Sequence, residues 1–488
     1  MSESMSSESS PEKPNQDPEQ LTTIAGNNPK ADNNVVDVPD GGFGWFVVAA
    51  YFLYNFSQWG ANAGYAVYLA EYLSTNEFSN ASALDYAAIG GLAFGTGLFF
   101  GPLIAWLVHR TNAQVVIAVG LVLQCASLLL AAFSKRLWEL YMTQGVMISF
   151  GLAFICIPSM TLLPQWFRRR RNVAIGIGAA GSGMGGVVFN LGMQKIMQER
   201  SVKYALITQC VICTFLNVVA LAMTRTRVKE IRNAQIAANR TPTPYRIFDL
   251  QVLQSVGYWL FVMYVLCTML GYVVLLYSLS AFTVSLGYSR YQGGIVSSMV
   301  SVGAFFGRPA MGLIADAFGP VTTSIVAHLI VTVFSLAMWI PCQNFATALV
   351  FGLIVGLFMG TIWSVMAPIA TRVVGLHKLS VCLGMIWIYL SAGSLTAPII
   401  GLELRVPSDK IADLPAGLNG YYKTAIFAGM MYFGSVIALW LLRGLLAARD
   451  QVAVAAETGF DDGELHLKVS TGEWARGLFK VRGLPRRI

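Results

Sequence analysis

Long apolar stretches separated by short polar ones recur along the chain from residue 43 to residue 446. Each holds about 20 residues or more, the length that crosses roughly 30 Å of hydrocarbon at about 1.5 Å per residue in a helix. The pattern predicts an all-α membrane protein with twelve transmembrane helices. The expected spans are 43–69, 87–108, 113–133, 139–163, 173–193, 204–224, 256–286, 292–315, 321–340, 345–370, 380–402 and 421–446.

Composition agrees with this pattern, because 55% of the 488 residues are hydrophobic and only 12% are charged, about half the charged fraction of a soluble domain. Nearly all charged residues fall in the tails or in the connections between spans. Glu139 and Asp316 stand at span ends, whereas Arg308 lies well inside its span. Arg308 is therefore the one basic residue whose position needs an explanation.

The basic residues of the short connections predict the orientation of the chain. With both termini in the cytoplasm, the inner connections hold thirteen Lys and Arg residues and the outer ones nine. Cytoplasmic loops carry such an excess, and the arginine run that includes Arg169 and Arg170 is expected to help fix the topology. The net charge of +8 then indicates contact with membrane lipids and not with nucleic acid.

The polar segments divide the chain into five parts. A tail rich in Ser, Pro, Asn and Glu is expected to be disordered and cytoplasmic, and a long polar loop separates two sets of six spans. Gly97 and Gly307 open related stretches with a spacing of 210 residues, and Pro158 and Pro368 repeat that spacing. Two six-helix halves with a substrate site between them are typical of secondary transporters. The expected parts are the tail 1–42, the N-terminal half 43–224, the cytoplasmic loop 225–255, the C-terminal half 256–446 and a cytoplasmic tail 447–488.

Two motifs open the first and fifth spans, "DGGFGW" from Asp40 to Trp45 and "WFRRRRNVAIGIGAAG" at 166–181. Physically, Trp45 is suited to the headgroup level and the arginine run to lipid phosphates, so both motifs are expected to act in topology and entry into the membrane. Together they resemble the paired signatures of the monocarboxylate-porter family within the major facilitator superfamily. The segment "WGANAGYAVYLAEYL" at 59–73 is most similar to the fungal, monocarboxylate-permease-like branch. The resemblance implies the major facilitator fold and transport by alternating access.

Arg308 is the leading candidate for substrate binding. An uncompensated arginine at the centre of a span costs roughly 2.5–3.5 kcal/mol on insertion scales, so it should face the bundle interior or a water-filled cavity. Ser301 and Ala304 share its helix face, and the span interiors contain no Asp or Glu to pair with it. A carboxylate brought by the substrate is a natural partner for a guanidinium, and the resemblance implies that role. The alternative is an arginine satisfied by backbone carbonyls and helix ends.

The chain departs from the proton-coupled members of the resembled family. Their aspartate four residues before the arginine and their lysine in the first helix align with Ala304 and Ala63. The resemblance therefore leaves facilitated diffusion or coupling through another group open, with protons as possible partners. Asp316 lies within the loop motif "GLIADAFG", where a carboxylate is expected to accept hydrogen bonds from a neighbouring helix N-terminus in one transport state. A solvated acid at a helix end is the alternative.

Neutral polar and aromatic side chains at helical spacing complete the predicted site. They offer hydrogen bonds beside the charge, although interhelical packing is the alternative role for each. The candidates are Asn55, Gln58, Asn62 and Tyr65 in the first span, Tyr264, Thr268 and Tyr272 in the seventh, Ser301 in the eighth, and Trp363, Trp387 and Tyr389 in the tenth and eleventh.

The leading hypothesis is a transporter of a monocarboxylate or related organic anion, in the plasma membrane rather than the vacuolar membrane. A carrier of a larger or neutral metabolite such as a vitamin, and a transporter-like nutrient sensor, are the alternatives. An enzyme is not expected, because the spans contain no paired carboxylates, metal-ligand cluster or Ser/His dyad, and no cofactor is implied.

Overall fold

The computed structural model divides the chain into two units. In the first, the described residues are 227–230 and 233, and Arg227 Nε donates to Glu230 Oε2 over 2.7 Å. The second unit holds all the helices discussed below. The structure describes residues 40–75, 78, 81–167, 170–230, 233, 247–375, 378–406, 418–455 and 469–479.

Among the described residues, the regular elements of the N-terminal half of the second unit are all helices. Its first helices are short. The half also contains two π-helical segments, η1 and η2, in which the backbone hydrogen bonds span five residues instead of four. The elements are α2 (Gly44–Asn55), η1 (Phe56–Gly60), α3 (Ala61–Ala63), α4 (Tyr65–Thr75), α5 (Ala83–Phe99), α6 (Gly101–Arg110), α7 (Ala113–Ala132), α8 (Leu137–Leu140), η2 (Tyr141–Met147), α9 (Ile148–Met160), η3 (Leu163–Gln165), α10 (Arg171–Glu199) and α11 (Val202–Met223).

The C-terminal half contains longer helices with clear start and stop signals. Ser289 and Gln292 form a capping box at the start of α15, and Gly319 and Gly375 have positive φ angles, 97° and 80°, where α15 and α18 end. The elements are α13 (Leu250–Leu253), α14 (Val256–Ser285), α15 (Arg290–Phe318), α16 (Pro320–Phe334), η4 (Ser335–Trp339), α17 (Phe345–Met359), α18 (Thr361–Val374), α19 (Leu379–Glu403), α20 (Tyr422–Ala455) and α21 (Thr471–Phe479).

These helices occupy each of the twelve apolar stretches. Within the described residues, ten helical segments are long and apolar enough to cross a membrane, and the pair α5 and α6, bent by 44°, gives an eleventh. The expected span 43–69 is built from α2, η1, α3 and α4, each shorter than a span. The all-α membrane fold predicted from the sequence is confirmed, with a first span that is interrupted rather than a single regular helix.

The C-terminal end differs from a simple tail. Helix α20 continues to Ala455, beyond the expected end of the twelfth span at residue 446. The short helix α21 packs against it, and Trp474 Nε1 donates to the carbonyl oxygen of Leu441 over 3.0 Å. Part of the segment 447–488 is therefore helical and attached to α20, while the predicted N-terminal tail up to residue 39 lies outside the described residues.

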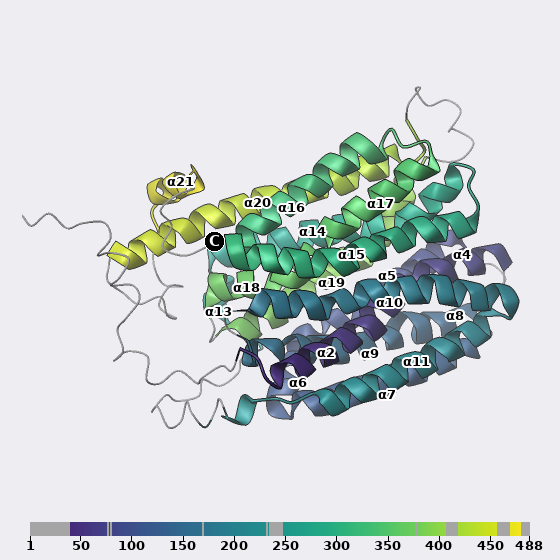
Figure 1. Cartoon of the computed structure of the whole chain (residues 1–488), viewed down its shortest axis with the longest axis horizontal. Coiled ribbons are helices and arrows are strands. Elements are labelled where there is room, and N and C mark those ends of the chain that lie inside the picture. The colour runs from purple at the N-terminus through teal and green to yellow at the C-terminus, as the bar shows by residue number, and fades with distance from the viewer. Residues whose placement is uncertain are drawn as a thin grey trace, which may run out of the picture. The chain divides into compact units, whose positions relative to one another are not determined.

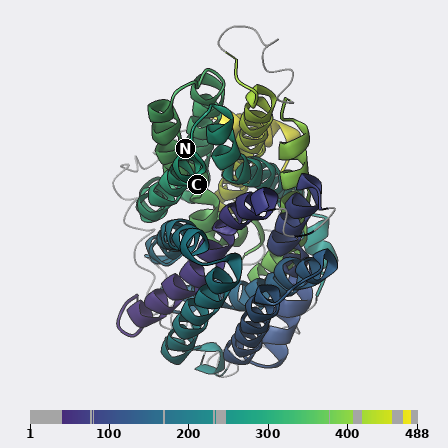
Figure 2. The ribbon, with the colours of Figure 1, turned by 90° about the vertical axis from the view of Figure 1, so that its right-hand side faces the viewer.

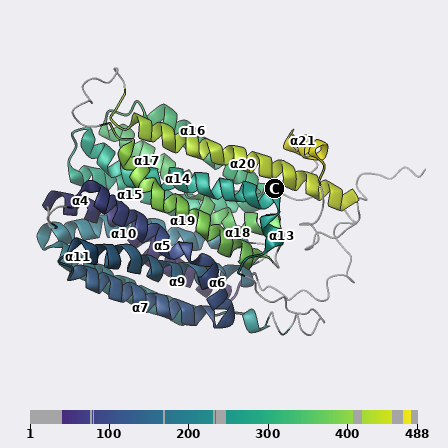
Figure 3. The same cartoon turned by 180° about the vertical axis from the view of Figure 1, so that it is seen from behind.

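The two halves meet along two helix pairs. Figure 2 shows the purple-to-blue helices of the N-terminal half in its lower part and the green-to-yellow helices of the C-terminal half above them. Helix α10 lies along α15, as Figure 1 shows, and α5 lies along α19, which is also visible from behind in Figure 3. A Cβ atom added to Gly176 of α10 would lie 2.5 Å from the carbonyl oxygen of Arg308 in α15. Only glycine permits this close approach between the halves.

Candidate functional site

Arg308 is buried in α15, with 4% of its surface exposed. It lies ten residues before Phe318 at the helix end, which is about 15 Å along the helix axis. Its Nη1 donates to the carbonyl oxygen of Ala179 in α10 over 2.7 Å, and its Nη2 donates to Tyr272 Oη in α14 over 3.4 Å. The buried Nε has no hydrogen-bond partner among the described residues. Two of the five N–H donors of the guanidinium are thus used by these contacts.

Among the described residues, no acidic side chain neutralises the positive charge of Arg308. No carboxylate oxygen lies within 4.0 Å of it in the described part of the chain. Gly360, between α17 and α18, borders the free Nε, and a Cβ added there would come within 2.9 Å of that atom. The site thus combines a buried cation with one strong contact across the two halves, to a backbone carbonyl of α10.

Ser301 shares the α10 interface with Arg308. A Cβ added to Gly186 in α10 would lie 2.5 Å from Ser301 Oγ. The predicted small and polar face of the eighth span therefore packs on the glycine-rich fifth span, and Ser301 is buried at this contact.

Five aromatic rings form a cluster close to Arg308, which we name the aromatic cluster. Trp59 and Trp363 lie at its centre, with ring centroids 4.8 Å apart, and Tyr272 contacts Trp363 edge-on at 6.3 Å. Trp59 belongs to η1 of the N-terminal half and Trp363 to α18 of the C-terminal half. The cluster consists of Trp59, Phe94, Tyr272, Trp363 and Trp387.

A small polar cavity lies within the N-terminal half. Gln58, Asn62 and Tyr65 line this cavity of about 30 Å³, enough space for a water molecule. The Oε1 atom of Gln58 is buried without a partner among the described residues. Asn62 Oδ1 accepts a hydrogen bond from Tyr277 Oη of the C-terminal half over 3.2 Å. Three of the four polar residues predicted in the first span therefore meet at one cavity.

An amide network beside this cavity joins three helices of the N-terminal half. Gln124 Oε1 accepts from Gln58 Nε2 and from Asn217 Nδ2, each over 2.8 Å, and Gln124 Nε2 donates to the carbonyl oxygen of Ser57 over 3.1 Å. Ser57 Oγ also donates to Asn217 Oδ1. Gln124 and Asn217 therefore use both ends of their side-chain amides within their own half. We name Gln58, Gln124 and Asn217 the amide network.

Other predicted site residues make their contacts elsewhere. Asn55 Nδ2 donates to the carbonyl oxygen of Tyr51 over 2.8 Å, and Thr268 Oγ1 donates to that of Tyr264 over 2.7 Å. Both bonds satisfy a side chain within its own helix. Tyr264 lies two turns before Tyr272 in α14 and stacks on His328, with ring centroids 5.5 Å apart. The structure does not place these three among the contacts of Arg308.

Asp316 connects the two halves near the end of α15. Its Oδ2 accepts a hydrogen bond from the backbone N–H of Val173 in the first turn of α10, over 3.1 Å. An acid at a helix N-terminus is stabilised by the N–H groups and dipole of that helix. The contact matches the geometry expected of Asp316, while its role in gating stays a prediction.

The two sequence motifs pack against each other at the start of α2. The backbone N–H of Asp40 donates to the carbonyl oxygen of Trp166 over 3.1 Å, and Trp45 contacts Phe167 edge-on at 5.2 Å. Trp45 is 40% exposed, and its location at the headgroup level stays a prediction. Arg170 precedes the first residue of α10, and Arg169 lies outside the described residues.

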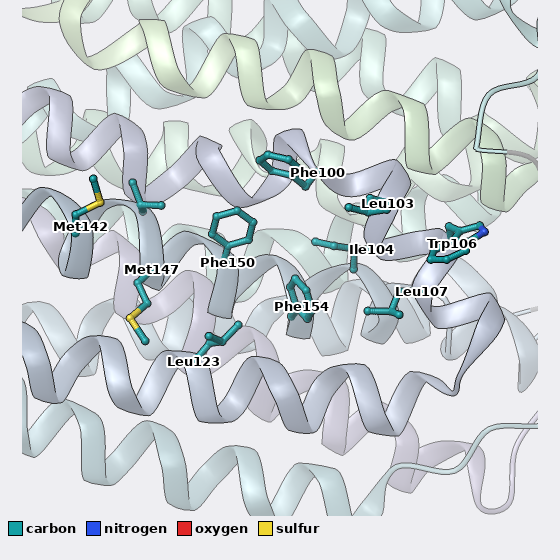
Figure 4. Close-up of a pocket in the computed structure, with 11 residues that line it drawn as sticks. Phe100, Leu103, Ile104, Trp106, Leu107, Leu123, Met142, Met147, Phe150 and Phe154 are labelled. Carbon is teal, nitrogen blue, oxygen red and sulfur yellow. The ribbon is translucent and has the colours of Figure 1, made fainter.

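An apolar groove is lined by none of the predicted site residues. It has a volume of about 580 Å³ and runs between α6, α7, η2 and α9. Figure 4 shows Phe100, Phe150 and Phe154 along its length, with Trp106 near one end. Phe100 is 40% exposed, so in a membrane this groove faces lipid. Its lining lacks the polar groups that a charged substrate needs.

Sequence reasoning named Tyr272, which accepts from Arg308, but it missed the partner Ala179 and the position of Trp59. Ala179 contributes a backbone oxygen, which no residue type signals, and it lies 129 residues away in the chain. Trp59 was not distinguished from the other aromatic residues of an apolar span. Its indole N–H donates to Cys156 Sγ over 3.2 Å, and only the π-helical turn of η1 places it between the halves.

Comparison with known proteins agrees with the fold. The Major Facilitator Superfamily model matches residues 47–398. The chain is 52% identical over 453 residues to "Probable transporter MCH2" of Saccharomyces cerevisiae, covering 93% of each protein. It is 28% identical to "Uncharacterized transporter ESBP6" of the same yeast, covering 83% of this chain and 59% of that protein. It is 26% identical to the "Fujikurins efflux protein" of Gibberella fujikuroi, covering 82% and 83%. The chain therefore belongs to the Major Facilitator Superfamily, as a multi-pass membrane transporter, and the monocarboxylate-porter resemblance of its motifs is confirmed.

Proposed function

We propose that this transporter carries a monocarboxylate or a related organic anion by alternating access, and that Arg308 binds the carboxylate. The observation that carries the proposal is the buried guanidinium of Arg308, which has no described acidic partner and one donor atom, Nε, without a hydrogen bond. Burial of a charge without a counter-charge is unfavourable. An anion that arrives with the substrate removes this penalty and uses the free donor.

The position of Arg308 supports a transport role. Its contact with the carbonyl oxygen of Ala179 joins the C-terminal half to the N-terminal half. Alternating access moves one half against the other around a site near mid-depth. A carboxylate is a better acceptor for a guanidinium than a neutral carbonyl, so substrate binding competes directly with this contact between the halves.

The test is uptake by the purified full chain in liposomes, with Arg308→Gln as the main variant. Loss of a hydrogen bond to a charged group costs about 1.5–3 kcal/mol, so uptake of an anionic substrate should fall about ten- to hundredfold. Arg449→Gln is the matched control, because Arg449 is also buried but donates to the carbonyl oxygen of Val373 in its own half. This control should keep the preference for anions. Unchanged anion uptake in Arg308→Gln would exclude the proposed carboxylate contact.

A competing role for Arg308 is a structural link between the halves. Under that role, Arg308→Gln reduces uptake of anionic and neutral substrates equally and lowers the melting temperature. The variant Arg308→Lys further distinguishes substrate binding from a structural link, because lysine keeps the charge but loses the planar donor arrangement. Substrate binding is supported if Arg308→Gln selectively loses anion uptake and Arg308→Lys recovers part of it.

A carrier of neutral metabolites is the second candidate. It is favoured by the neutral lining of the small cavity, where Gln58, Asn62 and Tyr65 supply hydrogen bonds without a charge. The same liposomes tested with uncharged metabolites distinguish the two candidates. Uptake of a neutral compound that is insensitive to Arg308→Gln supports this second function.

We further propose that transport is facilitated diffusion. We also propose that the protein lies in the plasma membrane with both termini in the cytoplasm. The residue four positions before Arg308 is Ala304, which cannot exchange a proton. Uptake should therefore continue when the pH gradient is collapsed by a protonophore. Surface labelling of a cysteine placed at exposed Tyr291, at the start of α15, tests the orientation in whole cells.

A further inference from the structure

The aromatic cluster lies at the contact between the halves. The five rings come from five different elements, η1, α5, α14, α18 and α19. Trp59 contacts Phe94 at 5.0 Å and Trp363 at 4.8 Å, and Trp363 lies nearly parallel to Trp387, with an interplanar angle of 29°. Four of the five rings are at least nine-tenths buried, and Trp59 is partly buried. Rings at these separations attract one another.

The π-helical segment η1 explains how Trp59 reaches this position. Gln58 and Trp59 are neighbours in the chain, yet Gln58 lies in the amide network of its own half while Trp59 contacts Trp363 of the other half. Segments of this kind frequently occur at functional sites. Here η1 turns one side chain inward and the next toward the opposite half.

The Trp59–Trp363 contact has to open during transport. Its two rings belong to opposite halves, and the halves move relative to each other in alternating access. Opening exposes two indole faces that had covered each other. A planar apolar group placed between them restores the lost ring contacts.

Tyr272 couples this ring contact to the charge of Arg308. The Tyr272 ring lies edge-on to Trp363, and its hydroxyl oxygen accepts a hydrogen bond from Arg308 Nη2. The cation and the Trp363 indole therefore contact the same side chain. One molecule with a ring and a carboxylate can reach both.

We infer that the substrates of this transporter include aromatic carboxylates, whose ring binds between Trp59 and Trp363 while the carboxylate binds Arg308. This inference rests on the proposed function and narrows its substrate class. A ring pair contributes beyond simple area burial, so we expect an aromatic acid to bind about two- to tenfold more tightly than an aliphatic acid of the same size.

Benzoate and cyclohexanecarboxylate are the probes, because both are seven-carbon monocarboxylates and only benzoate has a planar aromatic ring. Binding to the purified full chain is measured by calorimetry, and counterflow in liposomes is corrected for vesicles without protein. Wild type should prefer benzoate by about two- to tenfold, and Trp363→Leu should abolish that preference. Trp363→Phe should retain part of it. Trp138→Leu is the matched control, because Trp138 in α8 is 60% exposed and far from the cluster in sequence.

Several outcomes would overturn the inference. Equal affinity for the two acids in wild type would do so, as would an unchanged preference in both Trp363→Leu and Trp59→Leu. Binding of the neutral analogue benzamide as tightly as benzoate would remove the carboxylate from the proposal. The variant Arg308→Gln distinguishes failure of the aromatic-carboxylate inference from failure of the proposed function. If wild type binds the two acids equally and both lose binding in that variant, the anion carrier stands without aromatic selectivity. If neither acid depends on Arg308, the proposed function fails.

Discussion

The Arg308 site and the amide network are both polar and buried, yet they differ in charge and in location. Gln124 and Asn217 are neutral, belong to one half and use both ends of their amides. Arg308 is charged, contacts the opposite half and leaves Nε without a described partner. Neutral amides that are satisfied at both ends, as in Gln124 and Asn217, hold helices together. We propose that the incompletely satisfied charge between the two halves is instead prepared for a ligand.

The largest expected effect on stability concerns the amide network. Gln124→Leu removes three interhelical hydrogen bonds, each worth about 0.6–1.7 kcal/mol in membrane proteins, so the free energy of unfolding should fall by about 2–5 kcal/mol. The ratio of anionic to neutral uptake should stay unchanged, the opposite of Arg308→Gln. Thermal unfolding and liposome uptake measure both quantities. Val122→Ala, at a site 64% exposed on the same helix, serves as the control. A changed anion preference in Gln124→Leu would contradict the distinction between the amide network and the Arg308 site.

The second effect concerns the approach of the two halves at Arg308. Gly176→Ala places a Cβ 2.5 Å from the carbonyl oxygen of Arg308, and overpacking of this kind costs about 1–3 kcal/mol. We expect transport to slow about five- to hundredfold while the folded protein persists. Gly192→Ala is the matched control on α10, because a Cβ there meets nothing within 4 Å. Equal transport rates in the two variants would show that the close contact is dispensable.

A smaller effect is expected at Asp316. Asp316→Asn keeps an acceptor for the Val173 N–H but loses the charge at the N-terminus of α10, worth about 0.3–1 kcal/mol. The two halves should separate more often at this end, by about two- to fivefold. Distances between spin labels at exposed Thr111 and Phe318 report this separation. Glu199→Gln, which removes an exposed acid, should leave the distances unchanged, and an identical distribution for Asp316→Asn would argue for a simple helix-end acid.

The smallest effect concerns an ion pair remote from both regions. Lys378 Nζ lies 3.1 Å from Asp249 Oδ2. Burial raises the pKa of Asp249, but hydrogen bonds from Lys378 and the backbone N–H of Gln251 outweigh it and hold the pKa below its usual value. The stabilisation is therefore present above the ordinary Asp pKa of about 3.9 and is lost as pH falls through the lower folded-state pKa.

Asp249→Asn should reduce stability by less than about 1 kcal/mol at pH 7, because the pair is partly exposed. The difference from wild type should shrink as the pH is lowered below about 4. Melting temperatures across this range test the sign. A difference that grows toward acid pH would contradict the lowered pKa of Asp249.

The sequence by itself determined the membrane-spanning helical fold and predicted the burial of Arg308. Hydropathy and charge are local properties, so an apolar stretch with one arginine predicts a span and a buried cation before any packing is known. The motif beginning at Asp40 likewise identified the family. These features do not depend on which helices become neighbours.

Only the tertiary structure decided what Arg308 contacts and which polar residues lie near it. The carbonyl oxygen of Ala179 becomes a partner because glycines let α10 and α15 approach closely. The π-helical turn η1 interrupts the regular 3.6-residue period, so that Asn55 bonds within its own helix while Trp59 reaches Trp363. Contacts between distant segments depend on backbone geometry and packing, which the order of side chains alone does not specify.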